Sequence, residues 1–341
     1  MKAPGFWWTP PGEPAWAARV MAPVAALFGL AAWWRRARTV PFVAPVPVIC
    51  IGNLTAGGTG KTPMVALMLE RLSARGIAAH VLLRGHAGRE GRTAPHRVEI
   101  DRDDAAAVGD EALLHAALAP TWVARDRAAG VKAAVADGAQ AIVLDDGLQN
   151  PGLAHDMTVV MLDAVQGLGN GRLIPAGPLR EAPEPRLSTI DMAVLVGAAA
   201  ARARALATWP QIAAADPVGA VFQPRETGLS LERVRVIAFA GIGRPEKFFE
   251  TVEALGARLH RAEGFPDHYA YPDAVIRRLI GEAREANALL VTTEKDATRL
   301  SPALRREVVV VPVSLVLERP DRLDAALDTA LERFYARHPT S

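Results

Sequence analysis

The sequence predicts an α/β protein built on mostly parallel, doubly wound sheets, and three observations lead to this prediction. Short apolar runs recur along the chain, and most are continuous rather than alternating, which is typical of strands buried on both faces. Segments with helical periodicity separate these runs. A glycine-rich turn joins one apolar run, Val46 to Ile51, to a helical stretch that begins at Lys61. A strand, a turn and a helix in this order are the parts of a Rossmann-like unit.

The elements from Val46 onward alternate between strand and helix. The helix predicted over Lys61 to Arg75 has Met64, Leu67, Met68 and Leu72 on one face and ends at Gly76. Further strands are predicted at His80–Leu83, Ala141–Leu144, Met157–Leu162, Met192–Val196, Val234–Ala240, Leu289–Thr292 and Val308–Val313. This number of strands favours two sheets, with the Pro- and Gly-containing region Asp216 to Leu231 as the linker.

Composition limits the classes of function. A chain of 341 residues, half of them apolar, is long enough for about two domains of roughly 150 residues. The net charge is only +2, which argues against a basic surface for nucleic acid, so no nucleic-acid partner is expected. The single cysteine, Cys50, lies in an apolar run and has no partner for a disulfide, which favours a reducing compartment. We expect the catalytic body to be cytoplasmic.

The first 47 residues differ from the rest of the chain. Five of the seven tryptophans lie here, and an uncharged stretch, Val20 to Trp34, precedes Arg35, Arg36 and Arg38. The stretch has 15 residues, whereas a helix that crosses the hydrocarbon needs about 20. Tryptophans at both ends and arginines at one end predict a helix that lies in the headgroup region of an anionic leaflet. An ordinary helix buried against the body is the alternative.

The strongest chemical signal is the glycine-rich loop from Thr55 to Thr62. Its glycines let backbone N–H groups converge on phosphates, the helix N-terminus adds positive potential, Lys61 reaches the β and γ oxygens, and the Thr62 hydroxyl ligates Mg²⁺. The usual pattern begins with glycine, and here that position is Thr55. The predicted nucleotide-binding residues are Thr55, Ala56, Gly57, Gly58, Thr59, Gly60, Lys61 and Thr62.

Two carboxylates follow the predicted strand Ala141–Leu144. In P-loop proteins an acidic residue at the end of a buried strand holds Mg²⁺ directly or through water, and Asp145 and Asp146 are placed to do so. Adjacent carboxylates also occur without any function where a strand ends and a turn begins. Next to a P-loop, the metal interpretation is the stronger one.

Two other polar residues have open roles from the residues alone. Asp110 follows Gly109 and begins an apolar-periodic stretch, which favours a helix N-cap over a catalytic base. His268 lies in a loop among aromatic residues, where a lone histidine is more often a packing or surface residue. The segment Thr292 to Asp296 is either a capping segment or a functional loop that faces the cleft.

Six motifs in order resemble one known family, tetraacyldisaccharide 4'-kinase, the lipid A 4'-kinase of Gram-negative bacteria. The resemblance covers nearly the whole chain, and the threonine at the start of the loop is typical of this family. The motifs are Gly52–Pro63, Gly109–Glu111, Asp145–Gln149, Pro175–Glu181, Phe265–His268 and Thr292–Asp296.

The resemblance implies the reaction and the roles of single residues. ATP would phosphorylate the 4'-hydroxyl of tetraacyldisaccharide 1-phosphate, with Mg²⁺, at the cytoplasmic face of the bacterial inner membrane. Asp145 and Asp146 would lie at the Mg²⁺ and the reaction centre, Glu181 would contribute to the metal site, and Asp110 and His268 would form a catalytic dyad. Gln149 and Arg180 receive no definite role.

The expected organisation has four parts. Residues 1–47 would be an N-terminal hydrophobic, membrane-associated segment, 48–215 a P-loop kinase domain, 216–231 a linker region, and 232–335 a second α/β domain. The resemblance implies two α/β/α lobes with the nucleotide in the cleft between them. Two rival classes are a membrane-recruited P-loop ATPase switch of the partitioning kind and a soluble small-molecule P-loop kinase or ligase, and the second offers no reason for the Trp-rich N-terminus.

Overall fold

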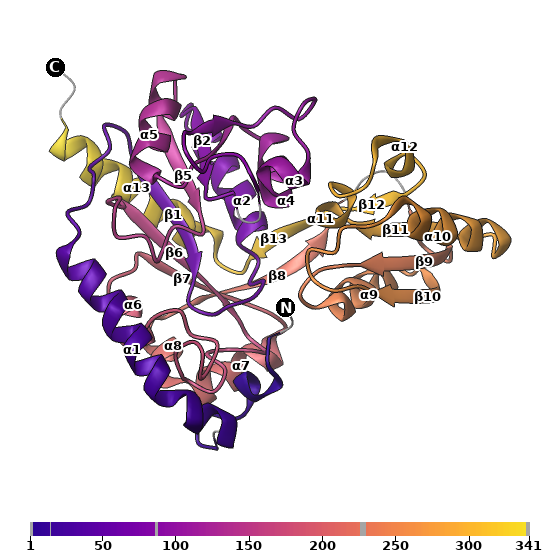
Figure 1. The fold of residues 1–341 in the computed structure, drawn as a ribbon, viewed down its shortest axis with the longest axis horizontal. Helices are drawn as coiled ribbons and strands as arrows, with labels where there is room; N and C mark the ends of the chain where they lie inside the picture. Colours follow the sequence, from indigo (N-terminus) through magenta and orange to yellow (C-terminus); the bar gives the residue numbers. More distant parts are fainter. Residues whose placement is uncertain (1–2, 14, 86–87, 226–229, 339–341) are drawn as a thin grey trace.

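The computed structural model describes residues 3–13, 15–85, 88–225 and 230–338. Its strands form two sheets (Figure 1). We call the nine-stranded sheet with its helices the large lobe and the four-stranded sheet with its helices the small lobe. In sheet order, the large lobe contains β13 (Val313–Leu317), β8 (Val218–Pro224), β7 (Met192–Val196), β6 (Met157–Asp163), β1 (Val48–Asn53), β5 (Ala141–Asp145), β2 (Ala79–Leu83), β4 (Thr121–Val123) and β3 (His96–Arg97).

The centre of the large sheet is parallel and buried on both faces. Every residue of β1, β5, β6 and β7 is buried, as their continuous apolar runs predict. Ile49 of β1 lies opposite Val143 of β5 on one side and Met157 of β6 on the other. Because neighbouring parallel strands end at the same edge, the loops after β1, β5 and β6 meet there. Only the outer pairs, β13 with β8 and β3 with β4, are antiparallel.

Helices cover both faces of the large sheet. One apolar core lies under α2 (Lys61–Ala74), the consecutive helices α3 (Ala105–Val108) and α4 (Asp110–Ala116), and α13 (Pro320–Arg337). The core on the other face lies under α5 (Arg127–Ala136), α6 (Pro183–Leu187), α7 (Ala199–Thr208) and α8 (Pro210–Ala214). The large lobe is therefore a three-layer α/β/α structure.

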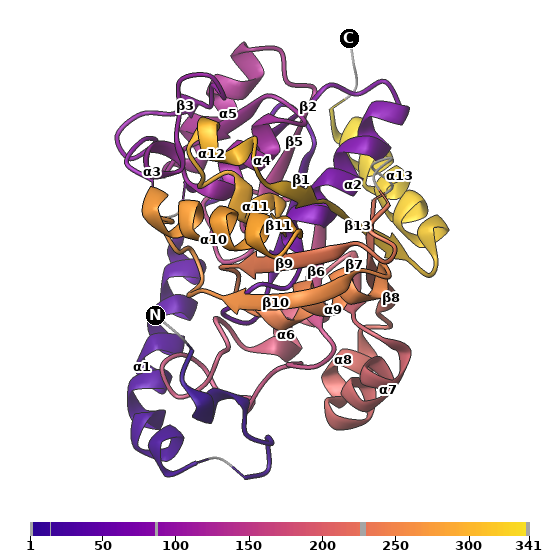
Figure 2. The same ribbon diagram turned by 90° about the vertical axis from the view of Figure 1, so that its right-hand side faces the viewer.

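The small lobe repeats this plan at smaller size. Its four strands are all parallel, in the order β10 (Arg258–Gly264), β9 (Arg235–Ala240), β11 (Leu289–Thr293) and β12 (Val309–Val311). One face packs on α9 (Pro245–Ala254), and the other packs on α10 (Asp273–Glu285) and α12 (Pro302–Arg305); the short α11 (Glu294–Ala297) follows β11. The small lobe stands beside the β8 and β13 side of the large sheet (Figures 1 and 2).

The N-terminal region forms the short helix η1 (Gly5–Trp8) and the long helix α1 (Trp16–Arg38). With 23 residues, α1 is long and apolar enough to cross a membrane by length and composition, so the helix is longer than the uncharged stretch that predicted it. Only Ala18 and Ala25 of α1 are buried, and large apolar side chains such as Leu27, at 67% exposure, face outward. The alternative of a helix buried against the body does not describe α1, which runs along the outside of the large lobe (Figure 1).

The two mostly parallel sheets confirm the predicted fold class, but the chain divides differently from the predicted boundaries. β8 lies inside the predicted linker 216–231, of which residues 226–229 are outside the described part of the chain. Within the predicted second domain, 232–335, β13 and α13 return to the large lobe. The reason is that β13 pairs with β8, about ninety residues earlier, and a local pattern does not reveal such a partner.

Candidate active site

The glycine-rich loop leaves the carboxyl end of β1 and enters α2. The buried Asn53 holds the loop from inside, because its Nδ2 donates to the carbonyl oxygens of Thr55 (2.8 Å) and Gly57 (3.1 Å). Gly60 has φ 88°, and a Cβ there would lie 2.5 Å from the ring of Phe222. Glycine is therefore required where the loop turns into the helix.

Thr55 stands where the usual loop begins with glycine, and its backbone explains why a side chain is tolerated. Thr55 is not among the residues with positive φ, and it forms a bridge with Leu179 in the next loop. The following N–H, of Ala56, donates to the Pro178 carbonyl at 2.8 Å. This position serves to anchor the loop, and anchoring requires no glycine.

Positive groups converge at the start of α2. No side chain caps the helix N-terminus at Gly60, so the first N–H groups of α2 are open to an anion. Lys61 Nζ lies 3.8 Å from Asp146 Oδ1, and Arg180 Nη1 lies 2.8 Å from both Asp146 oxygens. Burial alone would raise the pKa of Asp146, but the charges of Lys61 and Arg180 outweigh it and hold the pKa below its usual range. Asp146 is therefore a carboxylate at neutral pH.

Asp145, the last residue of β5, is almost completely buried. Its Oδ2 lies 2.7 Å from Nε2 of His115, a residue that the sequence analysis did not single out. Its Oδ1 has no hydrogen-bond partner in the part of the chain that the structure describes. A buried carboxylate oxygen without a hydrogen-bond partner suits a cation or the water bound to one.

Glu181 lies in a network that includes the N-terminal helix. Its carboxylate accepts from Gln149 Nε2 at 2.9 Å and pairs with Arg186 and with Arg36 of α1, each at 3.0 Å. Gln149 Nε2 also donates to the carbonyl of Asn53 beneath the predicted nucleotide-binding loop, residues 55–62, which we call the nucleotide loop. The structure therefore places Glu181 among cations, and its predicted metal role stays a prediction.

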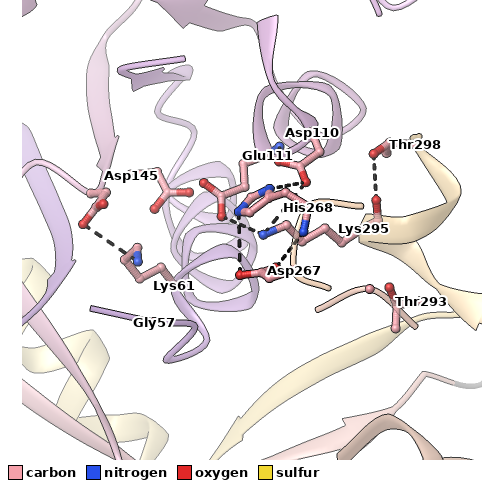
Figure 3. A network of polar contacts seen from close by, with 12 residues as sticks. Gly57, Lys61, Asp110, Glu111, Asp145, Asp267, His268, Thr293, Lys295 and Thr298 are labelled. Atoms are coloured by element: carbon pink, nitrogen blue, oxygen red, sulfur yellow. Dashed lines mark hydrogen bonds and ion pairs between the residues drawn. The ribbon is translucent and has the colours of Figure 1, made fainter. Parts of the chain in front are cut away.

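Asp110 and His268 come from opposite lobes, and their side chains meet (Figure 3). Asp110 is the first residue of α4 in the large lobe, and its Oδ2 lies 3.0 Å from His268 Nδ1. His268 sits in the loop after β10 with φ 58°, a left-handed conformation that is uncommon for a residue other than glycine. The two residues are 158 positions apart in the chain.

Arg299 and Lys295 add positive charge beside Asp110. The Arg299 Nε lies 2.9 Å from Asp110 Oδ2, its Nη2 is also bonded there, and Lys295 Nζ lies 3.9 Å away. Burial would raise the pKa of Asp110, but the hydrogen bond with His268 and the charges of Lys295 and Arg299 hold the pKa far below its usual range. Asp110 is thus a firmly ionised carboxylate.

The segment Thr292 to Asp296, whose role the sequence left open, positions Arg299. The fully buried Asp296 accepts from Arg299 Nη1 at 3.0 Å, from the Gly241 N–H at 2.9 Å and from the Tyr271 hydroxyl at 2.8 Å. Thr293 caps the short helix α11 through its side chain. The segment therefore has features of both predicted alternatives: Thr293 caps α11, and Thr293 to Lys295 line the cleft. Lys295 of α11 lies near Asp110, and Asp296 holds Arg299, which follows the helix, against Asp110.

A second contact between the lobes lies at Asp163, which the sequence analysis missed. Asp163 ends β6 and is buried, and it accepts from Lys247 Nζ (2.6 Å) and Arg244 Nη1 (3.2 Å) at the start of α9. Burial would raise the pKa of Asp163, but Lys247 and Arg244 lower it overall. Asp163 follows a buried strand just as Asp145 does, and this position was the signal that could have identified it.

One cleft of about 2030 Å³ connects these groups. It extends from the nucleotide loop to the small lobe and along α1, and His268 and Asp145 line it, whereas Asp110 does not. His268 therefore connects Asp110 to the cleft through their hydrogen bond. Apolar and aromatic side chains line the α1 end: Trp7, Trp8, Phe28, Ala32 and Trp33.

A bound Mg²⁺ fits the residues at the nucleotide loop. In the described ranges, no group of three or more His, Cys, Asp or Glu side chains is arranged to hold a metal ion alone. Magnesium in kinases is held by one or two carboxylates or hydroxyls together with the phosphates of the substrate. Thr62, on the first turn of α2, and the orphaned oxygen of Asp145 supply such a partial set.

Comparisons with known proteins agree with this geometry. The family model described as tetraacyldisaccharide-1-P 4'-kinase matches residues 17–332. A tetraacyldisaccharide 4'-kinase of Jannaschia sp. (strain CCS1) is 49% identical over 335 residues, covering 98% of this chain and all of the relative. One from Dinoroseobacter shibae is 50% identical over 331 residues, covering 96% of this chain and 97% of the relative.

A solved structure has the same fold. It is described as an "apo" form of LpxK from Aquifex aeolicus in complex with ATP, and it superimposes with a TM-score of 0.69. It shares 23% identity and covers 92% of this chain and 99% of its own.

Proposed function

The chain belongs to the tetraacyldisaccharide-1-P 4'-kinase family, and we infer that it phosphorylates the 4'-hydroxyl of tetraacyldisaccharide 1-phosphate with ATP, in lipid A biosynthesis. The observation that carries this conclusion is the loop from Thr55 to Thr62, set between β1 and α2 with the carboxylates of Asp145 and Asp146 beside it. The loop N–H groups and Lys61 would bind the phosphates of ATP. The family match over residues 17–332 is the basis for naming tetraacyldisaccharide 1-phosphate as the acceptor.

The proposed metal ligands are Thr62, Asp145 and Asp146, with Glu181 as a further candidate. Mg²⁺, when bound, neutralises charge on the β and γ phosphates. The negative charge of Asp146 is already neutralised by Lys61 and Arg180. Its carboxylate would therefore keep these two cations oriented toward the phosphates of bound ATP. Asp145 has the free oxygen, so we assign it the more direct role.

Asp110 and His268 are the proposed proton acceptors. The hydroxyl oxygen of the sugar forms a bond to the γ-phosphorus, the bond from that phosphorus to the β–γ bridging oxygen breaks, and ADP leaves. The hydroxyl proton passes to the Asp110–His268 pair. A carboxylate with a strongly lowered pKa is a weak base, but a loose transition state needs little proton transfer before the new bond forms. His268 faces the cleft and would orient the hydroxyl, with Asp110 behind it.

The cleft supports a lipid acceptor. Its apolar end lies along α1 and its polar end at the nucleotide loop, so acyl chains and a sugar headgroup would have separate places. The exposed apolar surface of α1, with arginines in its last turn, suits the headgroup region of an anionic leaflet. We therefore propose that the protein works at the cytoplasmic face of the inner membrane, with α1 as its contact.

One assay separates this function from its rivals. The protein is incubated with γ-labelled ATP, Mg²⁺ and lipid extract from a Gram-negative strain, and we expect label in a chloroform-soluble product. Label released as inorganic phosphate regardless of lipid would indicate an ATPase switch instead. Label in a water-soluble product would indicate a soluble small-molecule kinase.

A further inference from the structure

A buried histidine lies behind the carboxylate pair that follows β5. His115 of α4 places its Nε2 2.7 Å from Asp145 Oδ2, and the two side chains are 0% and 1% exposed. Both partners belong to the large lobe, so their contact does not depend on how the lobes are placed. Asp145 is a proposed metal ligand, whereas His115 has no part in the roles assigned above.

The hydrogen-bond pattern fixes the direction of this contact. An ionised carboxylate only accepts, so Nε2 carries the hydrogen and donates it to Oδ2. The Nδ1 atom of His115 has no hydrogen-bond partner among the described residues, so the contact with Asp145 is the side-chain hydrogen bond that the ring makes there. The ring thus satisfies one oxygen of Asp145 and leaves the other without a hydrogen-bond partner in the described part of the chain.

The other oxygen of Asp145, Oδ1, indicates the role of the His115–Asp145 pair. Oδ1 of Asp145 is buried without a hydrogen-bond partner in the described part of the chain, and Asp145 lines the cleft together with Lys61 and Thr62. A buried charged oxygen without a partner is costly, so a purely structural pair would be expected to satisfy both oxygens. The arrangement instead keeps one acceptor available for a cation.

We propose that His115 is a positioning residue for phosphoryl transfer: it holds the Asp145 carboxylate by Oδ2, so that Oδ1 is oriented to bind the divalent cation of the nucleotide. The inference rests on the proposed function, because it places that cation beside Asp145. Partners of this kind, which orient a metal ligand from behind, commonly change metal affinity by about 10- to 100-fold when removed.

The same helix positions the other half of the site. Asp110 is the first residue of α4, and His115 follows five residues later, which places the two side chains about 140° apart around the helix. Asp110 thereby reaches the small lobe, while His115 reaches the end of β5. Helix α4 therefore sets both the acceptor side and the metal side of the cleft.

The test measures metal binding rather than turnover. Mn²⁺ is titrated into the full-length protein with a non-hydrolysable ATP analogue, and free Mn²⁺ is followed by electron paramagnetic resonance. We expect His115→Leu to weaken Mn²⁺ binding by about tenfold or more, with unchanged affinity for the metal-free analogue. His115→Gln, whose amide nitrogen can occupy the place of Nε2, should restore most of the Mn²⁺ affinity.

His115→Asn is the matched control, because it carries the same amide one methylene shorter and does not reach Oδ2. It should bind Mn²⁺ as weakly as His115→Leu. If the leucine variant does not fold, the difference in Mn²⁺ affinity between His115→Gln and His115→Asn still tests the positioning role of His115. Equal Mn²⁺ affinity in the Gln and Asn variants, or wild-type affinity in His115→Leu, would overturn the proposal. A wild-type protein that fails to label lipid would instead refute the assigned acceptor. The Mn²⁺ titrations of the His115 variants do not depend on that result, because they contain no lipid.

Discussion

Lys61 is the residue whose removal tests the nucleotide loop most directly. Its ammonium group lies beside Asp146 at the start of α2, where the transferring phosphoryl group gathers charge. We expect Lys61→Ala to lower kcat by about a hundredfold or more, measured as label transferred to lipid. Lys132→Ala, an exposed lysine on α5, serves as control and should leave kcat nearly unchanged. Near-normal turnover in Lys61→Ala would remove the basis of the P-loop assignment.

The Asp110–His268 pair makes a second prediction at this scale. If the two side chains act as a unit, Asp110→Ala and His268→Ala should each lower kcat strongly with little change in the KM for ATP. The kcat of the double variant should then be scarcely lower than that of the more damaged single variant, because the first substitution has already abolished the contribution of the pair. Multiplicative losses in kcat would show that the residues have independent roles.

Single residues were predictable from the sequence only where their partners are close along the chain. The loop from Thr55 to Thr62 was predicted from its spacing, because its residues are consecutive in the chain. The contact between Asp110 and His268 spans 158 positions, and only the family resemblance linked them. His115 and Asp163 were missed, since their chemistry arises from partners that the tertiary structure supplies.

Helix α1 carries the prediction at the scale of elements. Its exposed apolar side chains should insert into a bilayer, so replacing Leu27 and Leu30 by glutamate should shift the protein from vesicles to solution. Co-sedimentation with vesicles containing anionic lipid measures this shift. The KM for lipid acceptor in vesicles should rise, while binding of ATP stays the same.

Ile100→Glu is the control for α1, because Ile100 is similarly exposed but lies outside the helix. It should leave sedimentation unchanged. If the α1 variants bind vesicles as the wild type does, the membrane role of α1 is wrong. If they instead lose folded structure without any change in sedimentation, α1 serves the packing of the large lobe.

At the same scale, the strands show which elements local patterns reveal. Fully buried strands such as β5 and β7 were predicted nearly residue for residue, because burial on both faces leaves a continuous apolar run. β10 was missed because it lies at the sheet edge and most of its residues are exposed. β8 and β13 stabilise each other as an antiparallel pair, and that pairing carries the chain back to the large lobe.

At the scale of the whole molecule, ionic contacts join the lobes at two places in the described part of the chain, the start of α4 and the end of β6. Asp110 meets His268 and Arg299 on one side, and Asp163 meets Lys247 and Arg244 on the other. At both places the large lobe supplies a buried carboxylate, and the small lobe supplies cations: Arg299 at Asp110, and Lys247 with Arg244 at Asp163. The two lobes are therefore held together by opposite charges at two separate positions.

Asp163 allows this connection to be tested through pH. Its pKa is lowered in the folded protein, so it binds protons less readily there than in the unfolded chain. The stabilisation is therefore fully present above the unfolded pKa, near 4, and is lost as the pH falls through the folded pKa. Asp163→Asn should lower the free energy of unfolding at pH 7 by about 1 to 3 kcal/mol, the usual worth of hydrogen bonds to a charged group.

The sign of the pH dependence distinguishes the contact from simple loss of packing. The gap in unfolding free energy between wild type and Asp163→Asn should stay constant from pH 8 to about pH 5 and narrow below about pH 4, as Asp163 becomes protonated in the wild type. Urea unfolding followed by fluorescence at each pH measures this gap, and Asp101→Asn, at an exposed position, controls for the change in net charge. A gap that persists undiminished at pH 3 would mean that the Asp163 charge does not hold the lobes together, and that shape alone sets their placement.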